Sequence, residues 1–493
     1  MTAAVVMPRS LGGRAVSVPA TTLAVLMLAA LLLRLPVIGD PLFDIDEQFY
    51  LLVGDRLLHG ALPYVDIWDR KPVGLFLIYA AIRLLGGDGV VQYQVVAMLS
   101  AVATAAIIAT IGRRFTRAIA ATGGGLVYLV WLNFLGGGGG QSPVFYNLLT
   151  ALAALATLAA VDDRDPARVR RRGDLAMLAM GLALQIKTTV LFEGCLFGAT
   201  FLWLEWTRSR RAGAVAALAL RLMAIALAPT LVVFAFYVAI GEGSAFWFAN
   251  VASILLRQTP PDAQPGVKLG GILLVLAPIA AAALAGVARR WRDGGGGLRL
   301  LAAWLGVAAA GFLAVAPYYN HYALPLLVPI SVAVALAMDR GMLWRAAVVT
   351  AAAALLILTG YPDIGRAQAA RERLATLESL IVPHLRGGCL FVFQGPPILY
   401  QASHACTLSR YVFPAHLNYL GEARAIGVDP AAEVTRILTA RPTVIVTSRR
   451  AAIVDPNPAT WPIVEAALRR DYRLVGVGRA DYRMLGVYAL KAR

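Results

Sequence analysis

Residues 43–50 read Phe-Asp-Ile-Asp-Glu-Gln-Phe-Tyr, and residues 64–72 read Tyr-Val-Asp-Ile-Trp-Asp-Arg-Lys-Pro. Nine of the thirty residues from 43 to 72 are charged, in a chain in which only 15% of the residues are charged. The stretch directly follows a hydrophobic run, Thr21 to Ile38. Clustered charges at a water–lipid boundary cost free energy unless they are solvated or paired, so this stretch is predicted to carry chemistry.

The composition is that of a membrane protein. The chain has 493 residues, is 59% hydrophobic and has a mean hydropathy of +0.69, values that a water-soluble globular protein of this size would not have. Its first 360 residues hold apolar runs of about 17 to 25 residues, each long enough to span a bilayer. Eleven spans are predicted: 19–39, 88–112, 118–135, 143–161, 174–188, 190–206, 217–240, 269–288, 299–316, 322–338 and 343–360. No small-x-small cleavage site follows the first run, which is therefore predicted to be a span and not a signal peptide.

The net charge of +17 comes largely from arginines in the short connections between the spans. They all fall on the side of the N-terminus: Arg9, Arg14, Arg113, Arg114, Arg117, Arg164, Arg168, Arg170, Arg171, Arg172, Arg208, Arg210, Arg211, Arg289, Arg290, Arg292, Arg340 and Arg345. The positive-inside rule makes this the cytoplasmic side, and no nucleic-acid partner is predicted. A further span at Val73 to Leu85 would move every later basic connection to the other side, so this short run is predicted to lie along or dip into the interface. With eleven spans, residues 40–72 and the C-terminal region lie outside the cytoplasm.

Residues 361–493 are predicted to form a small α/β domain, separate from a membrane domain of residues 1–360. Its strand candidates are Cys389 to Phe393, Thr443 to Thr447, Tyr472 to Val477 and Met484 to Ala489. Its helix candidates are Ile364 to Leu385, Ala431 to Leu438 and Pro462 to Arg469. Cys389 and Cys406 either form a disulfide, which an oxidising compartment permits, or remain buried thiols.

Other polar segments are predicted on the outer side of the membrane. They are the turn Gln185 to Thr189 with Lys187, the loop Gly241 to Lys268 with Arg257, the segment Tyr318 to Tyr322 with His321, and the run Gly136 to Gly140 followed by Gln141. The glycine run is predicted to be a flexible loop, and Trp68 and Trp247 are predicted to be anchors at the membrane interface. Many polar loops on one face favour an enzyme over a channel.

An Asp-Glu pair after the first span, followed by Gly-x-x-x-Tyr-x-Asp-x-Trp-Asp-x-Lys-Pro at Gly60 to Pro72, resembles the first outer loop of the GT-C glycosyltransferases. The later His321-Tyr322-Ala323-Leu324-Pro325 is similar to a second segment of that family. The resemblance is to the branch that holds the protein O-mannosyltransferases, the lipid A aminoarabinose transferases and bacterial relatives acting on envelope glycans. It implies a polytopic α-helical protein of the bacterial inner membrane with a small extracytoplasmic α/β domain.

Such enzymes move a sugar from a polyprenyl-phosphate carrier to an acceptor outside the cytoplasm. The acceptor implied here is an envelope glycolipid such as lipid A, lipopolysaccharide core, another envelope glycan or a protein. Inverting transfer needs a base for the acceptor hydroxyl and a cation for the leaving phosphate. The resemblance assigns the base to Asp46, with Glu47 orienting it or binding a metal. It assigns the donor phosphate to Lys71.

Further residues complete the predicted site. His321 and Lys187 are candidates for the same phosphate. Asp44, Tyr50, Tyr64 and Asp66 are candidates for the substrate pocket. A structural role remains the alternative for each of these side chains: the acids as charges in the first turn of a helix, Lys71 reaching phospholipid head groups, and Asp66 paired with Arg70.

Metal dependence stays open. Related enzymes often carry a second acidic residue between spans three and four, and this chain has Gln141-Ser142-Pro143 there. Either Asp44 replaces that acid in a Mg²⁺ or Mn²⁺ site with Asp46 and Glu47, or metal binding is weakened or absent. The alternative function is a transporter or flippase of a lipid-linked saccharide, which two matched halves with broken helices would favour. A third is a non-catalytic protein of envelope assembly.

Overall fold

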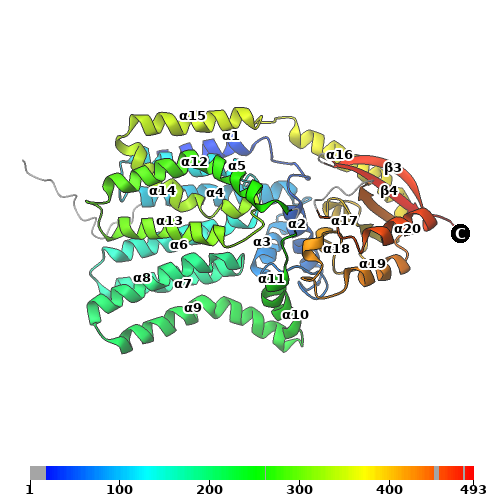
Figure 1. Ribbon diagram of the computed structural model, residues 1–493, viewed down its shortest axis with the longest axis horizontal. Helices are drawn as coiled ribbons and strands as arrows, with labels where there is room; N and C mark the ends of the chain where they lie inside the picture. Colours follow the sequence, from blue (N-terminus) through cyan, green and yellow to red (C-terminus); the bar gives the residue numbers. More distant parts are fainter. Residues whose placement is uncertain (1–17, 261–262, 449–454, 481–482, 493) are drawn as a thin grey trace, which may run out of the picture.

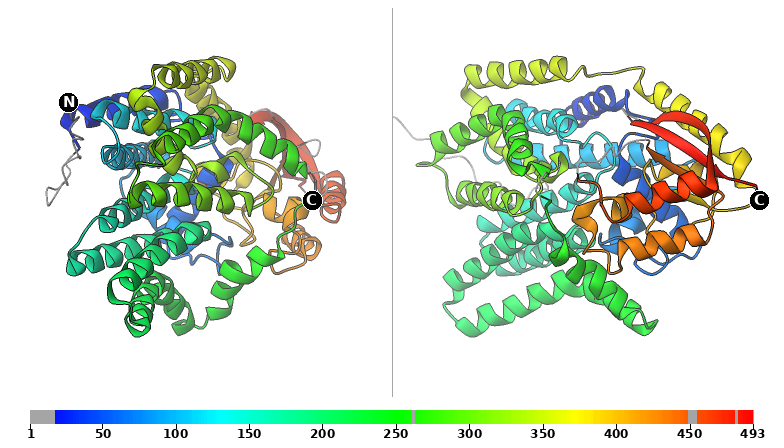
Figure 2. Two further views of the ribbon diagram at one scale, coloured as in Figure 1. Left: turned by 60° about the vertical axis from the view of Figure 1, so that its left-hand side comes forward. Right: turned by 45° about the vertical axis from the view of Figure 1, so that its right-hand side comes forward.

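The structure is a computed structural model that describes residues 18–260, 263–448, 455–480 and 483–492. A bundle of long helices carries a smaller α/β unit, residues 366–490, at one end (Figure 1). We call this end the outer end, and Figure 2 shows the same arrangement from two further directions. Arg9 and Arg14, which the charge argument used, lie outside the described residues.

Each of the eleven predicted spans corresponds to a helix of the bundle. These helices are α1 (Ala20–Arg34), α4 (Val90–Gly112), α5 (Ala118–Phe134), α6 (Ser142–Val161), α7 (Pro166–Leu184), α8 (Leu191–Ser209), α9 (Ala212–Ala239), α12 (Pro265–Arg290), α13 (Gly296–Leu313), α14 (Leu327–Arg340) and α15 (Met342–Leu358). In the described part of the chain five of them, α4, α6, α9, α12 and α13, are long and apolar enough to cross a membrane. The number of crossings therefore stays a prediction.

Burial separates the helices at the centre of the bundle from those at its edge. Helix α14 is buried along almost its whole length, from Leu327 to Ala337, as expected of a helix that is apolar on all sides and packed on all sides. Helix α9 is equally apolar, but only 11% of its membrane-length window is buried. Its apolar surface faces away from the protein, which suits contact with lipid.

Short helices connect the long ones at the outer end (Figure 1). They are α2 (Ile45–Leu58), α3 (Val73–Arg83), η1 (Thr188–Val190), α10 (Gly243–Trp247), η2 (Phe248–Ala252), α11 (Ser253–Leu256) and η4 (Asn320–Ala323). Helix α3 has 11 residues, which gives it a length of about 16 Å, roughly half the thickness of the hydrocarbon core. This length agrees with the predicted position along the interface, which stays a prediction.

The α/β unit is built on a four-stranded sheet. Its elements are α16 (Arg366–Leu385), β1 (Leu390–Val392), α17 (Ile398–Ala402), α18 (Ala415–Asn418), η5 (Leu420–Glu422), α19 (Pro430–Thr439), β2 (Val444–Ser448), α20 (Trp461–Asp471), β3 (Tyr472–Ala480) and β4 (Arg483–Leu490). The strand order is β1-β2-β4-β3, with β1 and β2 parallel and the other pairs antiparallel. The parallel pair needs a crossover, which α17 to α19 supply. All four strand candidates are strands in the structure.

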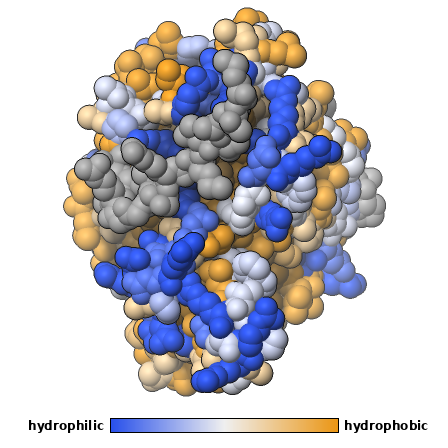
Figure 3. Space-filling model, turned by 90° about the vertical axis from the view of Figure 1, so that its left-hand side faces the viewer, coloured by the Kyte–Doolittle hydropathy of each residue, from blue (hydrophilic) through white to orange (hydrophobic). Residues whose placement is uncertain are grey.

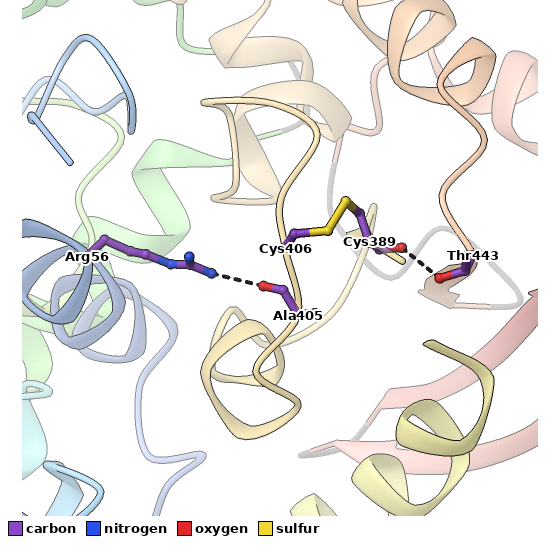
Figure 4. The surroundings of a disulfide bond; sticks show 5 residues. All are labelled: Arg56, Cys389, Ala405, Cys406 and Thr443. Atoms are coloured by element: carbon purple, nitrogen blue, oxygen red, sulfur yellow. Dashed lines mark hydrogen bonds between the residues drawn. A yellow bond between two sulfur atoms is a disulfide. The ribbon is translucent and has the colours of Figure 1, made fainter. Parts of the chain in front are cut away.

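Cys389 and Cys406 form a disulfide, with their Cα atoms 4.6 Å apart (Figure 4). Of the two readings that the sequence left open, the bonded one is confirmed. The bond closes the segment that leads from β1 to α17 and back. Beside it, the Ala405 carbonyl accepts a hydrogen bond of 2.9 Å from Arg56 of α2, so the bonded segment contacts the helix bundle.

Trp68 joins the first outer loop, residues 40–72, to the α/β unit. Its side chain is 2% exposed and packs in the same cluster as Phe391 and Ile445 of the sheet. Its backbone N–H donates to the Arg410 carbonyl at 2.9 Å, and its ring lies 4.6 Å from that of His416. The prediction of a membrane anchor at Trp68 is therefore wrong, because the ring is enclosed by protein. Trp247 is exposed, and its predicted role as a membrane anchor stays a prediction.

The glycine run between α5 and α6 is held in place, contrary to the prediction of a flexible loop. The guanidinium of Arg34 donates to the carbonyl oxygens of Gly137, Gly138 and Gly139 at 2.6, 2.6 and 3.0 Å. A Cβ added to Gly139 would overlap the Glu47 carboxyl. Glycine is needed at this position because the buried Glu47 side chain and the backbone approach each other closely.

Trp68→Ala should cost about 3–5 kcal/mol of stability, since a large enclosed ring is removed. We expect a lower apparent melting temperature in detergent and faster proteolytic release of the α/β unit. Trp247→Ala is the matched control, because Trp247 is 57% exposed. Equal behaviour of the two variants would contradict the placement of Trp68.

Gly139→Ala should destabilise the protein by about 1–3 kcal/mol through overpacking against Glu47. Gly306→Ala in α13 is the control, since a Cβ there meets no atom within 4 Å. The apparent melting temperature measures both. A Gly139→Ala protein as stable as the Gly306→Ala protein would show that the loop has room to move.

Candidate functional site

A carboxylate caps the N-terminus of helix α2. Asp44 is its N-cap residue, and its Oδ1 accepts from the backbone N–H groups of Asp46 and Glu47 at 2.8 and 3.4 Å. An N-cap carboxylate and acids in the first turn are both favoured at the positive end of a helix. Because consecutive helical residues point in different directions, Asp46 and Glu47 lie on different sides of α2.

Asp46 faces the lysine of the first outer loop. Its Oδ1 lies 3.6 Å from Lys71 Nζ, which also lies 3.1 Å from Asp69 Oδ2. Burial alone would raise the pKa of Asp46, but the charge of Lys71, with smaller contributions from His321 and Lys187, lowers it to about 2. Asp46 is therefore ionised at neutral pH, and Lys71 is held charged by the two carboxylates around it.

Asp69 shapes the loop on which Lys71 sits. Its Oδ1 accepts from the backbone N–H of Arg70 at 2.5 Å and of Lys71 at 3.0 Å, which forms an Asx-type turn. The hydroxyl of Tyr64 donates to the Lys71 carbonyl at 3.0 Å. The lysine is thus fixed at its backbone and at its ammonium group.

A buried carboxylate of the α/β unit joins two arginines. Glu422 Oε1 accepts from Arg70 at 2.9 Å and lies 3.0 Å from Arg257 Nε, and its Oε2 also accepts from Arg70. Burial would raise the pKa of Glu422, but Arg70 and Arg257 lower it to about 2. This ion cluster ties residues 40–72 and 241–268 to the α/β unit. No motif in the sequence pointed to Glu422.

A cavity of about 330 Å³ opens beside Lys71. Four cations line it: Arg70, Lys71, Lys187 and Arg257. The Arg257 guanidinium donates to the Tyr322 hydroxyl at 3.2 Å, and Lys187 Nζ lies 5.1 Å from the centre of the Tyr322 ring. Arg257 was noted in the sequence only as one polar group of its loop, and it was missed as a site residue.

The rest of the cavity wall is largely apolar. It includes Ala308, Gly311 and Phe312 of α13, Val315 just beyond that helix, and Glu193 in the first turn of α8. His321 also lines it, but burial lowers the pKa of this side chain to about 3 against the opposite effect of Asp46, and Lys187 and Lys71 add to the lowering. The imidazole is therefore neutral and offers a hydrogen bond, not a charge.

Glu47 does not lie beside Lys71 as Asp46 does. Its side chain is fully buried against Gly139, on the side of the Arg34 guanidinium, and it does not line the cavity. Burial and the neighbouring Asp44 raise its pKa well above the usual range. The helical geometry turns Glu47 toward the glycine loop, and its predicted role, orienting Asp46 or binding a metal, stays a prediction.

None of the four pocket candidates lines the cavity, and Asp46 also lies outside its wall, next to Lys71. Two of the four serve the loop instead. Tyr64 is buried among Tyr237 and Phe246, behind the loop. Asp66 accepts from the Leu62 N–H at 2.8 Å and lines a different, outward-facing cleft with residues of the α/β unit. Both stabilise the loop and neither lines the cavity. Asp44 and Tyr50, by contrast, contact Gln141, which contacts Asp46.

Gln141 connects the two acids of the first turn. Its Nε2 donates to Asp44 Oδ1 at 2.9 Å and to Asp46 Oδ2 at 3.2 Å, and its Oε1 accepts from the Tyr50 hydroxyl at 3.5 Å. Burial and the charge of Asp46 raise the pKa of Asp44 to about 7. The amide therefore stands between two carboxyl groups that would otherwise repel each other.

The residues around Asp46 do not fit a divalent metal. Across the described residues, no three His, Cys, Asp or Glu side chains form a group that could hold one. Asp46 is occupied by Lys71 on one oxygen and by Gln141 on the other, and Glu47 points away. A cation site needs several oxygen ligands converging on one point, and here the convergent groups are an ammonium and an amide donor.

No protein-family model matches the sequence, and no curated protein matches it at a significant level. The fold, however, is similar to that of solved structures. ArnT from Cupriavidus metallidurans, a lipid A aminoarabinose transferase solved with undecaprenyl phosphate bound, has a TM-score of 0.65 at 16% identity; the match covers 96% of this chain and 99% of that one.

The oligosaccharyltransferase of Archaeoglobus fulgidus is more distant. Its apo form has a TM-score of 0.53 at 10% identity, over 87% of this chain and 69% of that one. The same protein, AglB, was solved with an inhibitory peptide and a dolichol-phosphate, and in another structure with Zn and sulfate. Both proteins are GT-C enzymes. Their similarity extends over nearly the whole chain, so this protein has the fold of the GT-C glycosyltransferases, as the motif of its first outer loop predicted.

Proposed function

We propose that this protein is an integral-membrane glycosyltransferase that moves a sugar from a polyprenyl-phosphate donor to an envelope acceptor outside the cytoplasm, with inversion. One observation carries the proposal: within a GT-C fold, the ionised Asp46 is paired with Lys71 at the side of a cavity lined by cations. A carboxylate base for the acceptor proton and a cation for the leaving phosphate are the two groups that this reaction needs.

The cavity suits a lipid phosphate. Lys71, Lys187 and Arg257 supply the positive charge for the phosphate, and the apolar stretch from Ala308 to Val315 suits the first isoprene units of the tail. The ArnT structure holds undecaprenyl phosphate and the AglB structure a dolichol-phosphate. The chemistry that these lipids share, a phosphate on a long prenyl chain, matches the two halves of the cavity wall.

The same pairing gives Asp46 a means of becoming a stronger base. Its pKa of about 2 reflects the nearby Lys71, and a carboxylate with so low a pKa accepts a proton poorly. A donor phosphate on Lys71 brings negative charge that offsets the lysine, which raises the pKa of Asp46. Donor binding would thus prepare the base to take the proton of the acceptor hydroxyl.

Leaving-group stabilisation falls to the cations. As the sugar–phosphate bond breaks, charge grows on the phosphate oxygens beside Lys71 and Arg257. Both cations are already oriented, Lys71 by Asp69 and Arg257 by Glu422. Groups that are held in place before the reaction need no reorganisation when the charge develops.

The arrangement of the helix ends supports the proposed orientation in a bacterial inner membrane. The connections that hold the arginine clusters lie at the end of the bundle opposite the α/β unit, where Figure 3 shows hydrophilic side chains. By the positive-inside rule this end is cytoplasmic, which puts the cavity and the α/β unit outside.

A transfer assay in detergent tests the function itself. Purified protein receives extracted polyprenyl-phosphate sugars and envelope glycolipids, and mass spectrometry follows the sugar. We expect an acceptor heavier by one sugar residue together with free polyprenyl phosphate. Since detergent micelles have no two compartments, product cannot come from transport. Intact donor in this assay, together with translocation of the lipid in proteoliposomes, would instead support a flippase.

Asp46→Asn keeps the shape of the side chain and removes its basicity. Transfer should fall roughly a hundredfold or more, while binding of undecaprenyl phosphate and the apparent melting temperature stay close to wild type. Asp66→Asn serves as the control, because Asp66 lies in the same loop but bonds to the Leu62 backbone and not to Lys71. Near wild-type transfer by Asp46→Asn would remove Asp46 from the mechanism.

Lys71→Ala should weaken binding of undecaprenyl phosphate and slow transfer, because an oriented ammonium is lost. Lys71→Arg should be milder but not neutral, since a planar fork replaces a point charge. Lys268→Ala is the control, as Lys268 stacks on Tyr319 and does not line the cavity. Unchanged lipid binding in Lys71→Ala would leave the lysine as an interface anchor only.

The topology can be measured directly. A reporter that is active only in the periplasm, fused after Arg493, should be active. A cysteine introduced by Arg170→Cys in a Cys195→Ser background should react with an impermeant reagent only after the cells are permeabilised. The reverse pattern would mean that the count of spans is wrong by one.

A further inference from the structure

The inference concerns Gln141, and it rests on the proposed function for its effect on transfer but not for its effect on metal binding. Gln141 is 1% exposed and lies between Asp44 and Asp46. All of its polar capacity is used by protein: both N–H bonds of the amide go to carboxylates, and its oxygen accepts from Tyr50. If the side-chain amide of Gln141 were flipped, its oxygen in place of its nitrogen would face the carboxyl groups of Asp44 and Asp46.

The backbone holds Gln141 in this position. It is the N-cap residue of α6 and directly follows the glycine run that Arg34 holds. The Tyr79 hydroxyl donates to the carbonyl of Gly140, the residue just before it, at 2.8 Å. The amide is therefore a fixed part of the site and is not free to swing out.

The hydrogen-bond donors around Asp44 and Asp46 compensate the two carboxyl groups as a bound cation would. Asp44 Oδ1 accepts from two backbone N–H groups and from Gln141, and Asp46 is divided between Gln141 and Lys71. Two nearby carboxyl groups repel each other unless positive charge or donors lie between them. Here an amide and a lysine provide this instead of a metal ion.

We propose that Gln141 takes the place of a divalent cation between Asp44 and Asp46, so that it positions Asp46 for catalysis without metal, and that a single change to a carboxylate converts this point into a metal site. The amide contributes two donors and no net charge. A side chain of the same size with a carboxylate would contribute oxygen ligands, and with Asp44 and Asp46 would give three acidic groups facing one point, a set that suits Mg²⁺ or Mn²⁺.

Removal and addition of metal should have opposite effects on transfer by the wild type and by Gln141→Glu. After chelation, wild-type protein should keep its transfer rate and should bind no Mn²⁺ at this point, as measured by electron paramagnetic resonance. Gln141→Glu without metal should be roughly tenfold to a hundredfold slower, because three carboxyl groups repel and Asp46 loses its orientation. Added Mn²⁺ should bind with a new resonance signal and restore part of the rate.

Two control variants make the result specific. Gln141→Leu removes the donors and offers no ligand, so it should be slow and should gain neither Mn²⁺ binding nor rescue. Asp44→Asn combined with Gln141→Glu removes one of the three ligands and should weaken Mn²⁺ binding. If Gln141→Glu does not fold, the chelation and Mn²⁺ measurements on the wild type still test the proposal.

Loss of wild-type transfer on chelation, or Mn²⁺ binding by the wild type that Asp46→Asn abolishes, would overturn the inference. A metal-free Gln141→Glu protein as active as the wild type would overturn it as well. The Mn²⁺ measurement needs no substrate. Absence of transfer in every protein, together with the expected pattern of Mn²⁺ binding, would therefore reject the proposed function and keep the inference about Gln141.

Discussion

The structure depends on the compensation of buried charges. These charges lie where residues 40–72 meet the α/β unit. Glu422 and Asp69 are almost fully enclosed, and Asp46 is mostly so. An unpaired charge in such a place is strongly unfavourable. Each carboxylate therefore has a cation within reach: Lys71 for Asp46 and Asp69, and two arginines for Glu422. Removing one partner would leave the other charge buried and unpaired.

This compensation explains why the α/β unit and the bundle act as one structure. Glu422 comes from the unit, whereas Arg70 and Arg257 come from two separate connections of the bundle. Trp68 enters the apolar core of the unit three residues before Lys71. The cavity wall consequently depends on residues more than 300 positions apart. The proposed transfer needs the cations of the cavity to be oriented before the reaction, and an enclosed ion cluster would provide that orientation.

Features set by local pattern were predictable from the sequence. Hydropathy located the helices, since lipid demands long apolar runs, and the alternation of short strands and helices located the sheet. The loop motif identified Asp46 and Lys71, which the structure brings to 3.6 Å. The predictions were incomplete where the position of a residue depends on the direction of its side chain or on contacts with residues far away in the sequence. The position of Glu47 against the glycine loop was not foreseen, because one step along a helix turns a side chain away. Gln141 and Glu422 were missed because their partners lie far away in sequence.

The most direct test of the central claim is a structure of the protein with undecaprenyl phosphate bound. We expect phosphate oxygens at hydrogen-bond distance, about 2.7–3.2 Å, from Lys71 Nζ and from the Arg257 guanidinium. The prenyl chain should run along Ala308 to Val315. A phosphate bound elsewhere, for example in the outward-facing cleft lined by Arg410 and Arg436, with Lys71 still paired only to Asp46 and Asp69, would contradict it.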